Sequence, residues 1–272
     1  MINQIPPVIL FMHVTWQENP ERLRHYPPAS LSGADKDYAH QGREPRQARA
    51  FDFYRDIRHA AVMTLEQDRK RTTAKHWLIG PEAGVSSVDT LLRAEGRPRE
   101  STVFTVQHES DIIRGLAAEI NATMGVSGVI GGWNLRHGVW PLVVGKSMQH
   151  GATLDSRCLA DPTRDFNHPP LFQVETMYTQ GVYFKARPLP ALSDVMQWWG
   201  LQADNALPDI SQEELSTLSP ENMLAVGVPA VDKYLNGMAE LVMIYTQDVG
   251  GEYDPRGYTD LRGPRKTGSH GV

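Results

Sequence analysis

The chain has 272 residues, of which 40% are hydrophobic and 22% are charged, and its formal net charge is −5. This length suits one large α/β domain with elaborations, and the composition excludes a disordered chain and does not predict a large basic surface. The single cysteine, Cys158, excludes an intramolecular disulfide. The N-terminal residues lack the basic region of a signal peptide and no apolar run is long enough to span a membrane, so we expect a cytoplasmic protein.

The first predicted element is a strand over Val8–Val14, whose almost continuous apolar character is typical of a strand covered on both faces. Residues 17–50 are polar and rich in proline and arginine, which predicts a long loop insertion. The segment 51–67 is compatible with either strand or helix. The charge run Glu66–Lys75 favours a solvated turn between hairpin strands over a loop that contacts phosphates. Further strands are predicted at His76–Gly80 and Thr102–Gln107.

The middle of the chain predicts a helix, a strand and a second helix. Apolar residues recur at helical spacing over Ser110–Thr123, and Ser110 is the predicted N-cap. The apolar run Val129–Trp133 predicts a buried strand, which a polar turn joins to a helix that begins at Pro141 and ends at Gly151. A strand that passes through a polar turn directly into a helix is a common position for a functional site.

The C-terminal third is predicted to be mainly helical. Leu189–Leu201 forms one helix, and its residues Trp198 and Trp199 fit a core position better than a stacking platform for bases. Ser211 and Ser219 are predicted to begin two short helices. The last helix is predicted over Val228–Gln247, followed by a flexible arm over residues 248–272 that is rich in glycine and proline.

The strand–turn–helix segment resembles the second motif of the DnaQ-like 3′–5′ exonucleases, in particular the predicted exonucleases related to the proofreading domain of family B DNA polymerases. The residues that match the family motifs are Phe11, Thr15, Gly132, Trp133, Asn134, Pro141, Leu142, His150, Gly151 and Tyr234. The resemblance implies an α/β, RNase H-like fold, with a mixed central sheet flanked by helices. It implies one domain over residues 1–247, interrupted by the loop insertion and followed by the C-terminal arm.

Exonucleases of this family cleave a phosphodiester with two divalent metal ions, which carboxylates hold. The four carboxylate positions of the family fall here on Met12, Val14, Val139 and Met238. A methionine thioether is a poor ligand for Mg²⁺, and apolar replacements allow the site to close as ordinary core. The resemblance therefore implies no catalytic residue, no bound metal and no cofactor, and we expect the four positions to converge on one pocket.

These residues predict a catalytically inactive exonuclease-like protein that binds nucleic acid, or acts as a scaffold, in a larger replication or repair assembly. Protein partners and single-stranded nucleic acid are the expected partners, and no membrane is expected. The predicted nucleic-acid-binding residues are Thr15, Trp16, Trp133, Asn134, Arg136, His137 and Tyr234.

Three alternatives stay open at this point. The first is an active exonuclease that depends on Mg²⁺ or Mn²⁺, with displaced acidic ligands drawn from Asp111, Asp155, Glu175, Asp232 and Glu240. The second is a purely structural component that contacts protein partners through the loop insertion and the arm. The third is that the first strand belongs to the core of another α/β fold. The spacing of His13, His137 and His150 matches no zinc-binding pattern.

Overall fold

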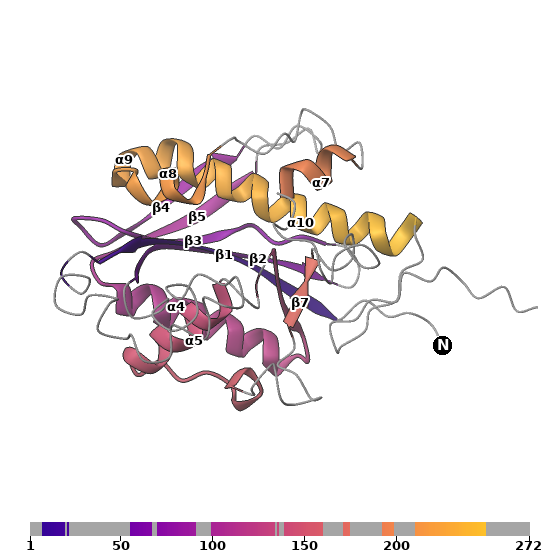
Figure 1. The fold of residues 1–272 in the computed structure, drawn as a ribbon, viewed down its shortest axis with the longest axis horizontal. Helices are drawn as coiled ribbons and strands as arrows, with labels where there is room; N and C mark the ends of the chain where they lie inside the picture. The colour runs from indigo at the N-terminus through magenta and orange to yellow at the C-terminus, as the bar shows by residue number, and fades with distance from the viewer. Residues whose placement is uncertain are drawn as a thin grey trace, which may run out of the picture.

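A seven-stranded mixed sheet forms the centre of the computed structural model, with helices on both of its faces (Figure 1). The structure describes residues 7–19, 21, 55–66, 70–90, 99–133, 135, 139–159, 171–174, 192–198 and 210–248. The strands are β1 (Val8–Glu18), β2 (Arg55–Glu66), β3 (Lys75–Ile79), β4 (Gly84–Thr90), β5 (Arg99–Val106), β6 (Val129–Gly132) and β7 (Leu171–Gln173). The helices are α4 (Glu109–Gly125), α5 (Trp140–Gln149), η4 (Ser156–Leu159), α7 (Leu192–Trp198), α8 (Gln212–Thr217), α9 (Pro220–Asn222), η6 (Met223–Gly227) and α10 (Val228–Asp248).

The strands lie in the order β4-β5-β3-β2-β1-β6-β7. β1, β2 and β3 form an antiparallel meander, whereas β5 runs parallel to β3, and β6 and β7 run parallel to β1. A sheet that mixes both orientations and carries helices on both faces confirms the predicted α/β class.

β1 is longer than predicted and extends well beyond its parallel neighbour. It pairs with β2 over its whole length, from Val8 to Glu18, but with β6 only over Ile9–Phe11. Gln17 and Glu18, which were expected in the loop insertion, therefore continue the strand. Of the rest of the predicted insertion, which was expected over residues 17–50, residue 20 and residues 22–50 lie outside the described residues. The register of the pairing between β1 and β2 shifts between Thr15 and Trp16, in the carboxyl half of β1.

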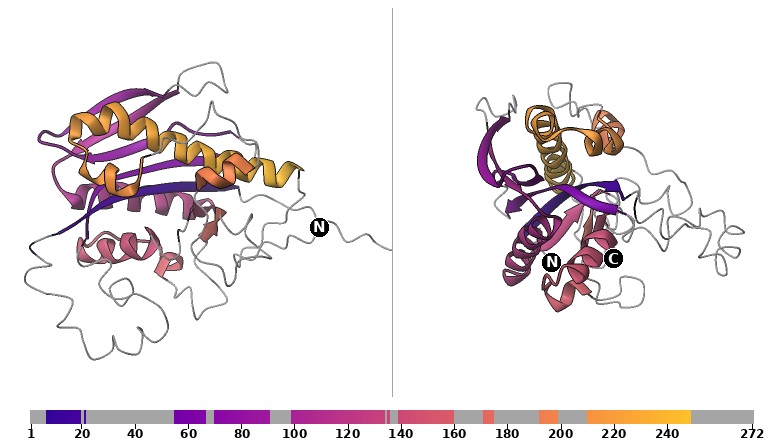
Figure 2. Two further views of the ribbon diagram at one scale, coloured as in Figure 1. Left: turned by 45° about the horizontal axis from the view of Figure 1, so that its top comes forward. Right: turned by 90° about the vertical axis from the view of Figure 1, so that its left-hand side faces the viewer.

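The sheet separates two hydrophobic layers, and Figure 2 shows the helices that cover its two faces in two further views. On one face, α7, α8, η6 and α10 pack on Ile9, Phe11 and neighbouring strand residues. On the other face, α4, α5 and η4 pack on Leu10, Met12 and Val14. Since consecutive side chains of a strand point to opposite faces, odd-numbered residues of β1 face α10 and even-numbered residues face α4 and α5.

Most predicted elements are confirmed, with a few local corrections. Ser211 caps α8 in a capping box with Glu214, and Gly151 ends α5 with φ +64°. His108, and not Ser110, is the N-cap of α4, and it makes no side-chain capping hydrogen bond. The ambiguous segment 51–67 contains the strand β2. β4 was not predicted, since its sequence GVSSVDT carries a single pair of valines and is mostly exposed.

After α5 the chain enters the 3₁₀ helix η4 before it reaches the last strand. The edge strand on that side of the sheet is β7. No helix among the described residues is both long enough and apolar enough to cross a membrane. The predicted C-terminal arm, residues 249–272, lies outside the described residues.

Candidate functional site

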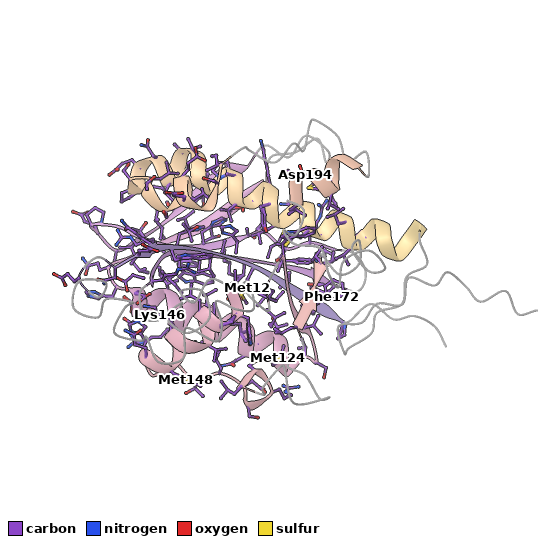
Figure 3. All side chains as sticks on the ribbon, in the orientation of Figure 1. Met12, Met124, Lys146, Met148, Phe172 and Asp194 are labelled. Atoms are coloured by element: carbon purple, nitrogen blue, oxygen red, sulfur yellow. The ribbon has the colours of Figure 1, made fainter. Side chains whose placement is uncertain are left out.

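The four positions to which the motif resemblance assigned carboxylates do not meet in one pocket. Met12 and Val14 are buried between the sheet and the α4/α5 layer, and Val139 packs against the same cluster. Figure 3 shows Met12 on this side of the sheet. Met238 is fully buried in the α10 layer, on the opposite face. The expected convergence of the four positions on one pocket is therefore wrong, because Met238 lies across the sheet from the other three.

The reason is the alternation of side chains along β1. The carboxylates of a two-metal site on β1 and on the last helix must lie on the same face of the sheet to share an ion. The residues of β1 that face α10 toward its carboxyl end are His13 and Thr15, one position after Met12 and Val14. A shift of one residue in a strand exchanges the two faces. Toward the carboxyl end of β1, the surface that faces the last helix is therefore polar.

A chain of buried polar side chains occupies this surface and crosses four strands to reach α10. Thr15 Oγ1 lies 3.5 Å from His59 Nδ1, and His59 Nε2 lies 3.0 Å from His76 Nδ1. His76 Nε2 lies 2.8 Å from Asp232 Oδ1, and Ser101 Oγ donates to Asp232 Oδ2 at 2.6 Å. Each of these five side chains is at most 2% exposed. We call this chain, from Thr15 to Ser101, the polar network.

With Asp232 ionised and both rings neutral, each ring nitrogen of the polar network has one role, as donor or as acceptor. An ionised Asp232 only accepts, so His76 Nε2 donates to it. In a neutral His76 ring, Nδ1 then accepts from His59 Nε2, and His59 Nδ1 accepts from the Thr15 hydroxyl, which is the longest and weakest link. Burial, followed by the proximity of His76 and His13, holds the pKa of His59 well below its ordinary value of 6.5. A neutral His59 fits this assignment.

His13 extends the polar surface along β1. Its ring packs edge-on against Tyr234 of α10, with 5.1 Å between ring centroids, and its Nδ1 is buried without a hydrogen-bond partner. Burial, with a smaller contribution from His76, lowers the pKa of His13 from 6.5 to about 4. Tyr234 and Trp133 are partly buried against the α10-side core. Three ring side chains, those of His13, Trp133 and Tyr234, therefore lie on the same face of the sheet.

The predicted nucleic-acid-binding residues divide between the two faces. Thr15, Trp133 and Tyr234 lie on the α10 side, although Thr15 is only 1% exposed and belongs to the polar network. Trp16 packs against the α4/α5-side core, and the guanidinium carbon of Arg55 lies 5.0 Å from the centre of its ring. Asn134, Arg136 and His137 lie outside the described residues.

A second group of charged side chains lies at the rim of the α4/α5 face. The Lys146 ammonium, which is fully buried, is 3.2 Å from Asp56 and 3.1 Å from Glu109, and His150 Nε2 is 2.8 Å from Glu109. Asn19 donates to the other oxygen of Asp56 at 2.6 Å. We call Lys146, Asp56, Glu109 and His150 the rim cluster. The contacts of the rim cluster connect the first turn of α4 with the C-terminal part of α5 and with the start of β2.

The acids proposed as displaced metal ligands do not gather at one point. Asp111 pairs with Arg114 on α4, Asp155 pairs with Arg157 before η4, and Glu240 pairs with Arg71. Asp232 is bound within the polar network, and Glu175 lies outside the described residues. In the described part of the chain, no group of three or more histidine, cysteine, aspartate or glutamate side chains has the arrangement of a metal site.

Sequence reasoning missed His59, His76 and Ser101, and it named Asp232 only as a displaced ligand. One signal was present: each of these residues is polar within a run of otherwise inward-facing apolar positions. In β2, for example, His59 precedes Ala61, Met63 and Leu65 at a spacing of two, and those three residues are core. A polar residue on a buried face predicts a buried partner, but the sequence does not identify that partner.

No protein-family model matches the sequence, and no curated protein matches it. The fold is similar to that of part of a solved structure, the family B DNA polymerase from the hyperthermophilic archaeon Pyrobaculum calidifontis. The similarity covers 88% of this chain with a TM-score of 0.50 and 11% sequence identity. It covers 25% of the polymerase chain, so the protein spans about a quarter of the length of that enzyme. At this identity the similarity establishes a shared fold.

Proposed function

We propose that the chain is an exonuclease-fold protein that no longer cleaves nucleic acid and instead binds single strands within a larger assembly. The proposal identifies the matched quarter of the polymerase with its proofreading exonuclease domain, as the motifs around Gly132–Leu142 suggest. It is supported above all by the side chains at the junction of β1 and α10. These side chains are His13 and the polar network, which includes Thr15. Asp232 of this network is the only fully buried carboxylate among the described residues.

The chemistry of this junction is unsuited to two-metal cleavage. Bridging two Mg²⁺ ions takes several carboxylate oxygens from the protein. Asp232 already accepts hydrogen bonds from His76 and Ser101, on both of its oxygens. Thr15 and the two histidines fill the volume between Asp232 and β1. A metal ion at this position would have to displace a connected set of buried hydrogen bonds.

The binding part of the proposal rests on the ring side chains at the same junction. His13, Tyr234 and Trp133 are partly exposed and come from β1, α10 and the turn after β6. Aromatic side chains bind single strands by stacking on bases, which is worth about 1–3 kcal/mol per base. With a net charge of −5, the chain relies on such stacking more than on a basic surface.

Two assays on the full chain test the proposal. A labelled single-stranded oligonucleotide is incubated with the protein in Mg²⁺ or Mn²⁺, and its binding is measured in parallel at increasing salt. We expect no shortening of the oligonucleotide, and binding that weakens as salt rises. Metal-dependent shortening would overturn the loss of cleavage. The absence of binding to both DNA and RNA would leave a scaffold that contacts only proteins and would overturn the binding part.

A set of single substitutions locates the binding surface. Tyr234→Ala and Trp133→Ala, on the α10 face, are each expected to weaken binding by about five- to a hundredfold. Trp16→Ala is the matched aromatic control on the opposite face, and Val85→Ala, at a residue 70% exposed on β4, controls for surface changes in general. If Trp16→Ala alone weakens binding, the surface lies on the α4/α5 side. Circular dichroism confirms that each variant is folded.

A further inference from the structure

Two side chains of α10, Asp232 and Tyr234, leave the helix toward opposite sides of its apolar face. Successive residues of an α-helix are rotated by about 100° around its axis. Val231 and Leu235 belong to the apolar core between α10 and the sheet. Asp232 follows Val231 by one residue, and Tyr234 precedes Leu235 by one residue. The two side chains therefore flank this apolar core on its two sides.

The contacts of the two side chains agree with this geometry. The Asp232 carboxylate accepts hydrogen bonds from His76 of β3 at 2.8 Å and from Ser101 of β5 at 2.6 Å. The Tyr234 ring packs against His13 of β1, with 5.1 Å between ring centroids. In the sheet, β3 and β1 lie on the two sides of β2, and α10 lies across this face (Figure 1). Hydrogen bonds thus hold one flank of α10, and the other flank carries a ring of the proposed binding surface.

The hydrogen-bonded flank fixes the rotation of α10 about its own axis. Apolar contacts depend little on direction, whereas a hydrogen bond weakens steeply when its angle is distorted. A rotation of about 20° moves a side-chain end that lies about 5 Å from the helix axis by about 2 Å. Such a rotation breaks the two short hydrogen bonds of Asp232 and displaces the Tyr234 ring by a similar distance.

Further polar contacts hold the same flank. Asn236 and Glu240 follow Asp232 at intervals of four residues, so the three side chains form one row along α10. Arg71, between β2 and β3, donates to Asn236 at 3.2 Å and pairs with Glu240 at 3.4 Å. Asn236 in turn donates to the main-chain carbonyl of Asp232 at 2.8 Å. This flank is therefore anchored over about two turns of the helix.

We propose that Asp232 is a positioning residue for the proposed binding surface. Its hydrogen bonds to His76 and Ser101 set the rotation of α10, and this rotation places the Tyr234 ring beside His13, where it stacks on a base. The inference rests on the proposed function, which takes Tyr234 as a binding residue. Asp232 is 2% exposed, so it acts on a bound strand only through Tyr234.

Contact between the two rings is the first measurement, and it needs no ligand. In protein with labelled histidine and tyrosine, we expect a nuclear Overhauser effect between the His13 and Tyr234 rings. Asp232→Leu lacks the two hydrogen bonds and should reduce this effect strongly. Asp232→Asn should retain it, because the amide oxygen accepts from His76 and the amide nitrogen donates to the Ser101 hydroxyl. An unchanged effect in Asp232→Leu would overturn the proposal.

A matched control separates positioning from a general loss of stability. Val242→Ala opens a cavity in the apolar core under the same helix and leaves the polar network intact. We expect it to lower the urea midpoint but to retain the contact between the His13 and Tyr234 rings. A loss of this contact in Val242→Ala equal to that in Asp232→Leu would overturn the proposal, because any weakening of the layer would then displace Tyr234.

Binding affinity is the second measurement, analysed as a double-mutant cycle. A labelled single-stranded oligonucleotide, as DNA and as RNA, is titrated with each variant. Asp232→Leu should weaken binding by no more than Tyr234→Ala does, and it should weaken binding no further when residue 234 is already alanine. In the Trp133→Ala background it should retain its full effect. Equal weakening by Asp232→Leu with and without the Tyr234 ring would overturn positioning through Tyr234.

The two measurements separate this inference from the proposed function. If the wild type binds neither DNA nor RNA, the proposed function fails, and the contact between the His13 and Tyr234 rings alone decides whether Asp232 positions Tyr234. If Asp232→Leu does not fold, Ser101→Ala removes one of the two hydrogen bonds and replaces it in both measurements. We expect Ser101→Ala to weaken the ring contact and the binding, and an unchanged ring contact would overturn the proposal.

Discussion

Along β1, both faces of the sheet bury mainly apolar side chains, but the two faces differ in where their buried polar groups lie. On the α4/α5 face, Leu10, Met12 and Val14 form dry core, and the buried charge of Lys146 lies at the rim beside partly exposed carboxylates. On the α10 face, the polar network crosses the middle of the layer, with Asp232 and both histidines fully enclosed.

This difference has a physical cause and a functional consequence. Charges at a rim keep part of their hydration, so the rim cluster needs only a few good contacts. A carboxylate in the centre of a layer must have its hydrogen bonds supplied by the protein, which explains the chain of partners around Asp232. The α10 face is therefore the face on which a change of charge has the larger effect.

The largest expected effect comes from placing a charge in the dry face. Met12→Asp places an acid where the motif resemblance expects one but buries a carboxylate among apolar side chains, so we expect a loss of about 5 kcal/mol or the absence of folding. Lowering the pH should reduce the loss, because the protonated acid is neutral. Urea unfolding measures it, with Gln17→Asp at the exposed end of the same strand as control. A loss below about 1 kcal/mol would mean that Met12 faces a polar pocket.

The next effect is on the polar network itself. Asp232→Ala removes the acceptor of His76 Nε2 and Ser101 Oγ and leaves two buried donors, so we expect a loss of about 3–4 kcal/mol in the free energy of unfolding. Glu213→Ala, an exposed acid on α8 in the same layer, is the control and should change stability by less than about 0.5 kcal/mol. Comparable values for the two variants would contradict a buried network.

Removing the charge of the rim cluster should have a smaller effect. Lys146→Met leaves Asp56 and Glu109 without their shared cation, but their side chains, 30% and 12% exposed, regain water. We expect a loss of about 2 kcal/mol, which is smaller than for Asp232→Ala. Lys75→Met, which breaks the exposed pair with Glu119 at 2.6 Å, is the matched control at below about 1 kcal/mol. A larger loss for Lys146→Met than for Asp232→Ala would reverse the ranking of the two faces.

The smallest effect concerns a local helix signal outside both clusters. Ser211→Ala removes the capping box of α8, in which Ser211 Oγ accepts from the Glu214 main chain and Glu214 accepts from the Ser211 main chain. We expect a loss of about 1 kcal/mol by thermal or urea unfolding. Ser216→Ala, later in the same helix, retains the box and should be nearly neutral. Equal losses would show that the box does not stabilise the layer.

Several elements followed from local sequence because their signals are local. The apolar run of β1, the serine that caps α8, the proline in the first turn of α5 and the positive φ of Gly151 each depend on a few neighbouring residues. β4 was missed because an exposed edge strand with two serines lacks both a continuous apolar run and clear alternation. The ambiguous segment that contains β2 was resolved only by its pairing with β1.

The candidate site was only partly predictable. The motif resemblance predicted a site formed by the carboxyl part of β1, the turn after β6 and α10. These elements lie around the candidate site. Within β1 the motifs pointed to Met12 and Val14, whereas His13 and Thr15 are the residues that face α10. The run VILFMHV is apolar on both faces of the strand, so it does not show whether odd- or even-numbered residues face α10.

Taken alone, the sequence determined which segments form most of the strands and helices and where several of them end. Tertiary structure decided which face of β1 meets α10, and it brought His76 and Asp232 together across 156 residues of chain. Local propensity depends on contacts within a few residues, whereas a buried hydrogen bond between strand and helix depends on how the layers stack. The polar network is therefore a property of the folded chain.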